Sequence, residues 1–343
     1  MRAFYLDAPG QYRMADIALP EHPGADEVSL KVQLVGLCGS DLNTFSGRNP
    51  LVSFPRIPGH EIAAVVAEAG SNVPEEFKPG TAVTMLPYFN CGKCSACRQG
   101  RLNACRNNET LGVQRDGALT EFVIAPWTKL KKAPALPMET LAMVEPLTVG
   151  NHAVTRGRIA AGDTVLVMGC GMVGLGAVAG AAFRGARVIA MDMDEAKLDL
   201  ARRCGAQQVL DARGESVLER LKDLSGGEGP DVAIEAVGTP ATFRMAVDVV
   251  AFAGRVVYIG YAKEPVSYET KFFVQKELDI LGSRNATPAD FDEVIALLES
   301  GRFPVEDVVS LVVPLEQAGK ALQRWSANPA SMRKIMVKVA ASS

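Results

Sequence analysis

Residues 165–177, VLVMGCGMVGLGA, decide how the second half of the chain folds. A short apolar run of strand length comes first, and glycines follow at positions 169, 171 and 174 with the spacing G-x-G-x-x-G. In such a turn the first glycine allows the tight bend, the second lets a pyrophosphate approach the backbone, and the third lets helix and strand pack closely. The stretch therefore predicts a strand, a glycine turn and a helix whose N-terminus attracts phosphate.

Glycines with this spacing can also serve packing alone, so the following sequence is informative. The strand-like run at residues 187–192 ends at Asp192, which is 18 residues (192 − 174) after Gly174. A carboxylate near this distance holds the ribose hydroxyls of an adenosine and repels a 2′-phosphate. Residue 193 is Met rather than Arg. We therefore expect NAD rather than NADP, against the alternative that Asp192 merely caps its strand.

Strand-like and helical runs alternate around this motif. Helical patterns follow residue 195 and recur near 215–224 and 240–252, between six apolar runs at 164–169, 187–192, 207–212, 231–238, 255–260 and 278–283. Alternation of this kind predicts an α/β fold with a doubly wound, six-stranded parallel sheet covered on both faces. The uncharged run 164–183 is long enough for a membrane span, but its glycines and strand-like start favour a buried strand followed by a buried helix.

The first part of the chain has a different pattern. Runs rich in Val, Ile and Leu at residues 27–37, 61–70 and 81–86 are separated by Pro-Gly turns, which predicts an irregular, mostly β domain. The last apolar run, RKIMVKVA at 333–340, has no place in a complete six-stranded sheet. We therefore expect it to return to the first domain. The predicted domains are 1–147 with 286–343, and 148–285.

The composition excludes several classes of protein. A net charge of −3 without a basic block argues against nucleic-acid binding, and 48% hydrophobic residues supply core for two domains. The first residues lack the apolar segment of a secretory signal, so we expect a cytoplasmic protein in a reducing compartment, not bound to a membrane. Clustered cysteines there bind metal more often than they form disulfides.

Four of the seven cysteines lie within residues 91–105, CGKCSACRQGRLNAC. Disulfides and a reactive redox thiol are the alternatives to a metal site. The spacing C-x2-C-x2-C-x7-C can bring four thiolates around one point, and a complete S4 shell leaves no position for a substrate. A nucleic-acid-binding zinc ribbon would have its second pair roughly 15–20 residues later. We therefore predict a structural zinc that folds a lobe at about 88–110, bound by the four-cysteine cluster of Cys91, Cys94, Cys97 and Cys105.

A second set of metal-binding residue types is scattered along the chain. Cys38 lies in GLCGSD, His60 and Glu61 lie in PGHE, and Glu145 lies in EPLTVGNHA. Each has an ordinary structural explanation when taken alone: a buried thiol, a loop histidine, or a glutamate at a helix start. Together they supply a thiolate, an imidazole and carboxylates, which suit zinc. Their separation in sequence does not show whether they meet in space.

In this order along nearly the whole chain, these motifs resemble the zinc-dependent medium-chain alcohol dehydrogenases of the sorbitol and threonine dehydrogenase kind. The resemblance implies a GroES-like catalytic domain interrupted by a Rossmann domain, and two zinc ions per chain. Cys38, His60 and Glu61 would hold a catalytic zinc, with Glu145 beside it or bound to it. The stretches GRNP and GSRNA look most like the branch that acts on sugar acids and polyols, such as galactonate, idonate and galactitol dehydrogenases.

The resemblance also implies an activity, namely oxidation of a secondary hydroxyl of a polyol or sugar acid to a ketone with hydride transfer to NAD. Ser40 would be the first proton acceptor. Many relatives have a histidine where this chain has Asn43, so we hypothesise that protons leave through water with help from Glu145 or His152. The residues implied to bind the cofactor are Gly169, Gly171, Met172, Val173, Gly174, Asp192, Val237 and Arg284.

Four residues are candidates for the substrate site. Arg48 and Arg115 can each pair with a carboxylate, because a guanidinium fork matches that group. Arg284 follows the sixth apolar run, where the resemblance implies an arginine that faces polyol hydroxyls, and Asn285 comes next. A threonine or butanediol dehydrogenase is the alternative within the family. A non-catalytic nucleotide-binding relative, or a zinc-free quinone reductase relative, is the alternative outside it and would not need Cys38 or Glu61. The resemblance further implies a dimer or tetramer, with residues 278–283 as a candidate dimer edge.

Overall fold

The computed structural model describes residues 1–340, and the chain forms two compact units. The first unit is Met1–Glu145 with the chain from Val305 onward, and the second is Pro146–Pro304. The second boundary thus lies 19 residues (304 − 285) later than the sequence predicted. The difference arises because helix α10 (Pro288–Glu299) packs on α5 (Met172–Phe183) and therefore belongs to the second unit.

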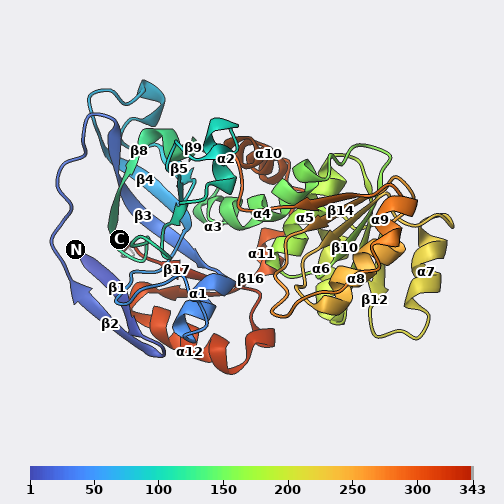
Figure 1. The fold of residues 1–343 in the computed structure, drawn as a ribbon. Helices are drawn as coiled ribbons and strands as arrows, with labels where there is room; N and C mark the ends of the chain where they lie inside the picture. The colour runs from blue at the N-terminus through green and yellow to red at the C-terminus, as the bar shows by residue number, and fades with distance from the viewer. Residues whose placement is uncertain (341–343) are drawn as a thin grey trace. The chain divides into compact units, whose positions relative to one another are not determined.

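The second unit contains one six-stranded sheet (Figure 1). Its strand order is β12-β11-β10-β13-β14-β15, and every neighbouring pair is parallel. This confirms the predicted Rossmann-type sheet. The order reverses between β10 and β13, and ligands of such sheets bind outside the carboxyl ends of the strands at that point. The strands are β10 (Thr164–Met168), β11 (Arg187–Asp192), β12 (Gln208–Asp211), β13 (Val232–Glu235), β14 (Arg255–Tyr258) and β15 (Asp279–Gly282).

Burial on both faces explains why these strands are almost wholly apolar. All five residues of β10 are buried, although alternate side chains of a strand point to opposite faces. Helices α5, α6 (Glu195–Arg203), α7 (Val217–Leu224) and α8 (Pro240–Val249) pack on the strands and cover them. Helix α6 begins where the Asp194 carboxylate accepts hydrogen bonds from the backbone N–H groups of Ala196 and Lys197.

The glycine turn connects β10 to α5 and requires glycine at two points. Gly169 has φ +92°, a left-handed conformation that side chains other than glycine rarely adopt. A Cβ on Gly174 would lie 1.8 Å from the carbonyl oxygen of Gly169, so helix and turn pack backbone to backbone. The run 164–183 is therefore a strand followed by a helix, as predicted. Among residues 1–340, no helix is both long and apolar enough to cross a bilayer.

The first unit is built on a seven-stranded sheet with the order β16-β17-β3-β4-β5-β9, and β8 also pairs with β3. Strand β17 pairs antiparallel with β3, so the carboxyl-terminal run lies in the sheet of the first unit. A hairpin, β1 (Arg2–Ala8) and β2 (Gln11–Asp16), accompanies the sheet. The strands of the seven-stranded sheet are β3 (Glu27–Leu37), β4 (Glu61–Ala69), β5 (Ala82–Met85), β8 (Phe122–Pro126), β9 (Leu130–Lys132), β16 (Val309–Pro314) and β17 (Lys334–Lys338).

Candidate metal and dinucleotide sites

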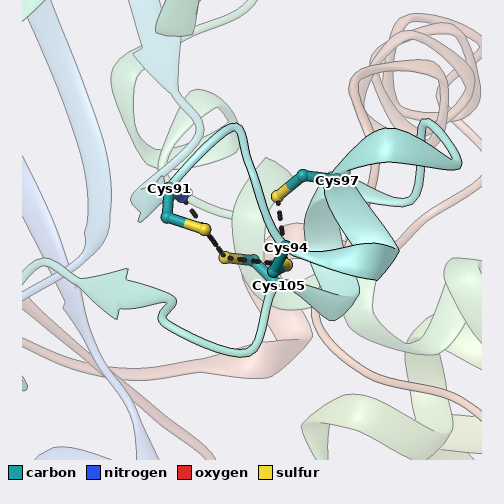
Figure 2. A group of neighbouring side chains, drawn as sticks. All are labelled: Cys91, Cys94, Cys97 and Cys105. Atoms are coloured by element: carbon teal, nitrogen blue, oxygen red, sulfur yellow. Dashed lines mark hydrogen bonds between the residues drawn. The ribbon is translucent and has the colours of Figure 1, made fainter.

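The four-cysteine cluster lies on a small lobe of the first unit, next to a two-stranded sheet formed by β6 (Tyr88–Phe89) and β7 (Glu109–Thr110). Its thiols point toward one another (Figure 2). The sulfur–sulfur distances are 3.5 Å for Cys94–Cys97, 3.9 Å for Cys94–Cys105 and 3.6 Å for Cys105–Cys91. A zinc–sulfur bond of about 2.3 Å gives a tetrahedron with edges of about 3.8 Å, so the four sulfur atoms fit one zinc ion.

The surroundings of these thiols also favour a cation. Backbone N–H groups of Arg106 and Cys97 lower the pKa of Cys94 to about 6, and N–H groups of Lys93 and Cys94 lower the pKa of Cys91. Desolvation and the neighbouring thiols raise the pKa of Cys97 to about 12. Without a metal these three thiols would therefore ionise very unequally, whereas a bound zinc favours the thiolate form of its cysteine ligands.

A second cluster, the Cys38 cluster, consists of Cys38, His60 and Glu61. One ligand atom from each lies within 4.8 Å of the others. Cys38 follows β3 and precedes helix α1 (Gly39–Phe45), and Glu61 is the first residue of β4. Register brings them together, because Gly36 on β3 faces Glu61 on β4. A Cβ on Gly36 would lie 2.0 Å from the Glu61 carboxylate, so only glycine leaves room for this side chain.

Lys334 is a member of this site that sequence analysis missed. Its Nζ atom donates to both carboxylate oxygens of Glu61, at 2.7 Å each, and it is 2% exposed. Glu61 is completely buried. A buried carboxylate is costly unless a cation or hydrogen bonds compensate it, and Lys334 supplies both. A lysine in the otherwise apolar run 334–337 was the available signal, but its partner lies 273 residues away in sequence.

Glu145 lies beside the Cys38 cluster but outside its three-residue ligand set. It is in the first turn of helix α4 (Val144–Arg156) and is 4% exposed. The hydroxyl of Tyr88 donates to its Oε1 atom at 2.5 Å. Burial raises the pKa of Glu145 above its usual range, although the positive charge of His60 acts in the opposite direction.

Two buried polar atoms at this site have no hydrogen-bond partner in the part of the chain that the structure describes. They are the Oγ atom of Ser40 and the Nδ1 atom of His60, which lies 4.0 Å from the Oδ1 atom of Asp41. Burial by itself would lower the pKa of His60, but Asp41, Cys38 and Glu145 together raise it well above the usual value. Buried polar atoms normally have partners, so orphans next to a thiol and carboxylates indicate a ligand. A zinc ion and a substrate hydroxyl fit this set of donors and acceptors.

The dinucleotide site of the second unit is organised by Asp192. Its Oδ2 atom accepts a hydrogen bond from the backbone N–H of Cys170 in the glycine turn, at 2.8 Å. Its Oδ1 atom accepts from the N–H groups of Met193 and Asp194, at 2.8 and 3.1 Å. The carboxylate is thus fixed at the carboxyl ends of β10 and β11, next to the N-terminus of α5. This geometry suits a ribose diol and a pyrophosphate.

Asp192→Asn is expected to change cofactor preference, because it removes the negative charge while keeping the size of the side chain. The ratio of the dissociation constants for NADPH and NADH should shift at least about tenfold toward NADPH, which corresponds to about 1.4 kcal/mol. Fluorescence titration of both reduced cofactors measures it. Asp211→Asn, at the end of the neighbouring strand β12, is the control and should leave the ratio unchanged. An unaltered ratio in Asp192→Asn would contradict the assignment.

The other predicted cofactor residues lie in or beyond these turns. Met172 and Val173 begin α5, and Val237 follows β13 with its side chain 47% exposed. The N–H of Val237 donates to the buried carboxylate of Glu235 at 2.9 Å, which fixes that turn. Arg284 follows β15 and is exposed. Asn285 next to it has φ +53° and is half-buried.

Several candidates have structural partners that the sequence did not reveal. His152 is buried, and its Nδ1 atom lies 2.8 Å from the Asp290 carboxylate, which also accepts hydrogen bonds from Thr287 at the start of α10. This arrangement favours a structural link between α4 and α10 over the hypothesised proton route. Arg115 stacks on Phe89 at 4.2 Å and pairs with Glu109 at 3.7 Å. Arg48 is exposed.

Comparison with known proteins gives a consistent result over both units. Residues 24–135 match the family model of the alcohol dehydrogenase GroES-like domain, and residues 172–300 match that of the zinc-binding dehydrogenases. The chain is 34% identical to sorbitol dehydrogenase of Bacillus subtilis over 98% of this chain and 97% of that protein. It is 32% identical to L-galactonate-5-dehydrogenase of Escherichia coli over 88% of each.

Solved structures agree with this similarity. The alcohol dehydrogenase RspB of Escherichia coli CFT073, in complex with NADH, superposes with a TM-score of 0.90 at 28% identity over 99% of both chains. A zinc-binding dehydrogenase of Sinorhizobium meliloti bound to NADP superposes with a TM-score of 0.89 at 31% identity, over 98% of this chain and 99% of that one. Both structures hold a nicotinamide dinucleotide, which is NADH in the first and NADP in the second.

Proposed function

Because this chain belongs to the zinc-type medium-chain alcohol dehydrogenase family, we propose that it oxidises a secondary hydroxyl of a polyol or sugar acid to a ketone and reduces NAD. The observation that carries the proposal is the Cys38 cluster, in which His60 and Glu61 are buried, with the Oγ of Ser40 beside it lacking a hydrogen-bond partner among the described residues. Relatives named for a polyol and for a sugar acid support the substrate class. The fixed carboxylate of Asp192 supports NAD over NADP.

Two zinc ions per chain are part of the proposal. The four-cysteine cluster would hold one that has only a structural role, because its four thiolates complete the shell. Cys38, His60 and Glu61 would hold the other and leave one position open. A zinc ion bound there acts as a Lewis acid that lowers the pKa of a hydroxyl group in that open position.

The residues around the Cys38 cluster have separate tasks. The Asp41 carboxylate accepts hydrogen bonds from the N–H groups of Cys38 at 2.9 Å and Gly59 at 3.3 Å, so it holds together the two segments that carry the ligands. Ser40 accepts the proton of the substrate hydroxyl and passes its own to water. Asn43, one helical turn further on, is exposed and cannot titrate, so water is the route to solvent.

Ser40→Ala is expected to lower kcat about a hundredfold, the usual effect of losing a proton-transfer group, while zinc content stays unchanged. Ser40→Thr keeps a hydroxyl and should retain most of the activity. Ser46→Ala removes a hydroxyl from the other end of α1, where it contacts Ser326, and should have no effect. Initial rates of NAD reduction measure all three. A Ser40→Ala enzyme within twofold of the wild type would remove Ser40 from the proton path.

An NAD-reduction screen tests the substrate class. Aldonates, free polyols, polyol phosphates, threonine and 2,3-butanediol are compared at equal concentration, with metal-depleted protein as the blank. We expect the highest kcat/KM for a polyol or an aldonate, with Arg284 and Asn285 as candidate contacts to its hydroxyl or carboxylate groups. If kcat/KM were highest for threonine or butanediol, the proposed substrate class would be wrong, but the proposed reaction, oxidation of an alcohol by NAD, would stand. Absence of turnover with every alcohol would contradict the proposed function.

Self-association is also part of the proposal. Strand β15 is the last strand in the sheet order, and most of its residues are exposed, including Ile280 at 40%. An unpaired strand edge with an exposed apolar side chain is a site for pairing with another copy of the same chain. We place the dimer contact along this edge.

A further inference from the structure

Glu235 is a buried carboxylate to which the described residues supply no cation. It is the last residue of β13 and is completely buried. Buried carboxylates are normally paired, as Glu61 is with Lys334 and Asp290 is with His152. Among the described residues, no lysine, arginine or histidine forms an ion pair with Glu235, and its Oε2 atom has no hydrogen-bond partner.

Three donors converge on the other oxygen of this carboxylate. The Oε1 atom accepts from the N–H groups of Val237 at 2.9 Å and Gly238 at 2.7 Å, and from the hydroxyl of Thr242 at 2.8 Å. Several donors on one oxygen are typical of an ionised carboxylate, which can only accept hydrogen bonds. The Oε2 atom lies at the end of β14, where a Cβ on Gly260 would be 2.4 Å from it. The charge is therefore fixed in place but not neutralised.

The position of Glu235 relates it to the dinucleotide site. Strand β13 is the neighbour of β10 where the strand order reverses, and the N–H of Ala236 donates to the carbonyl of Met168 at the end of β10, at 2.9 Å. A Cβ on Gly169 would lie 3.1 Å from the carbonyl oxygen of Ala236, so the turn after β13 packs against the glycine turn. With the adenosine ribose at Asp192 on the β11 side, a dinucleotide that crosses the glycine turn has its nicotinamide half on the β13 side.

We propose that the buried charge of Glu235 makes the site select the oxidised cofactor, because it attracts the cationic nicotinamide ring of NAD⁺ and not the neutral ring of NADH. The inference rests on the proposed function, since it concerns the same cofactor. NAD⁺ and NADH share their adenosine and pyrophosphate groups, so Glu235 acts equally on those parts of both. A buried charge is screened by solvent much less than an exposed one, and Glu235 therefore acts on the ring without touching it.

The test compares the dissociation constants of NAD⁺ and NADH, both measured by calorimetric titration of the zinc-bound protein at one salt concentration. Glu235→Gln keeps an oxygen for the three donors but removes the charge, and should weaken NAD⁺ binding at least about threefold relative to NADH binding. A purely structural role would weaken both by the same factor. Glu235→Asp keeps the charge and should retain the wild-type ratio of the two constants.

Asp231→Asn is the matched control, because it removes the same charge just before the opposite end of β13, where the carboxylate accepts the N–H of Thr164. It should leave the ratio unchanged. If Glu235→Gln does not fold, Val237→Lys provides a second test. Position 237 is 47% exposed, and a cation there opposes the field of Glu235, so NAD⁺ binding should again weaken relative to NADH binding.

The outcomes separate this inference from the proposed function. A wild-type ratio in Glu235→Gln, or in Val237→Lys where Glu235→Gln does not fold, overturns the inference. So does an equal shift of the ratio in Asp231→Asn, because the place of the charge would then not matter. The same shift in Glu235→Asp as in Glu235→Gln also overturns it, because the effect would then follow from shape and not from charge. A wild-type protein that binds neither NAD⁺ nor NADH overturns the proposed function itself.

Discussion

Cys38→Ser is expected to bind one zinc ion instead of two, and its kcat/KM should be more than about a hundredfold lower than that of the wild type. Its melting temperature should equal that of the wild type. Substitution of a residue that only supports a metal ligand typically lowers metal affinity or activity 10–100-fold. Substitution of a direct ligand should therefore lower activity by at least as much. The fold should survive because residue 38 is the N-cap of α1, where serine is among the preferred residues. The carboxylate of Asp41 still accepts the N–H of residue 38 at this cap.

Steady-state kinetics, zinc analysis and thermal unfolding are measured on the same preparation of Cys38→Ser. Cys204→Ser is the control, since Cys204 is a buried thiol of the second unit and outside both clusters. Activity near that of the wild type, or a full complement of zinc, would show that Cys38 does not hold the catalytic metal.

Cys94→Ser is expected to have the opposite pattern, with loss of stability as the main effect. The lobe at about 88–110 has only short elements. Its ends are joined by the two residue pairs of β6 and β7 and by contacts of the cluster, such as the N–H of Cys91 to the Cys105 sulfur at 3.3 Å. The free energy of zinc binding at such a site contributes directly to the free energy of folding of the segment. A loss of about 4 kcal/mol would lower the melting temperature by roughly 10 °C for a unit of this size.

Thermal unfolding with and without a zinc chelator measures this effect. The wild type should become less stable when chelator is added, and Cys94→Ser should respond far less because the lobe has already lost its metal. Ser95→Ala, at the adjacent exposed position, is the control and should behave like the wild type. A Cys94→Ser protein that melts normally would contradict the structural role of the cluster.

The strands of both units could be predicted because their signals are local. Six apolar runs separated by helical patterns became β10 to β15, and the glycine turn follows β10 at Gly169 as expected. The boundary between the units could not be predicted in the same way. The pattern of residues 288–299 indicates a helix, but nothing in that segment shows that it packs on α5 rather than with the first unit.

The candidate site was predictable in its residue types but not in its contacts. Cys38, His60 and Glu61 were found as motifs, and the register of β3 and β4 is what brings them together. The partners that complete the site, Lys334 and Tyr88, lie far from Glu61 and Glu145 in sequence and belong to no motif. The buried pairing of His152 with Asp290 was missed for the same reason, as 138 residues separate them.

The most direct test is the zinc content per chain, measured side by side in the wild type, Cys38→Ser and Cys94→Ser. It tests whether the four-cysteine cluster is structural and the Cys38 cluster is catalytic. The predicted values are two, one and one, with activity lost in Cys38→Ser and stability lost in Cys94→Ser. One zinc in the wild type, or loss of activity without loss of zinc in Cys38→Ser, would contradict this division between the two sites.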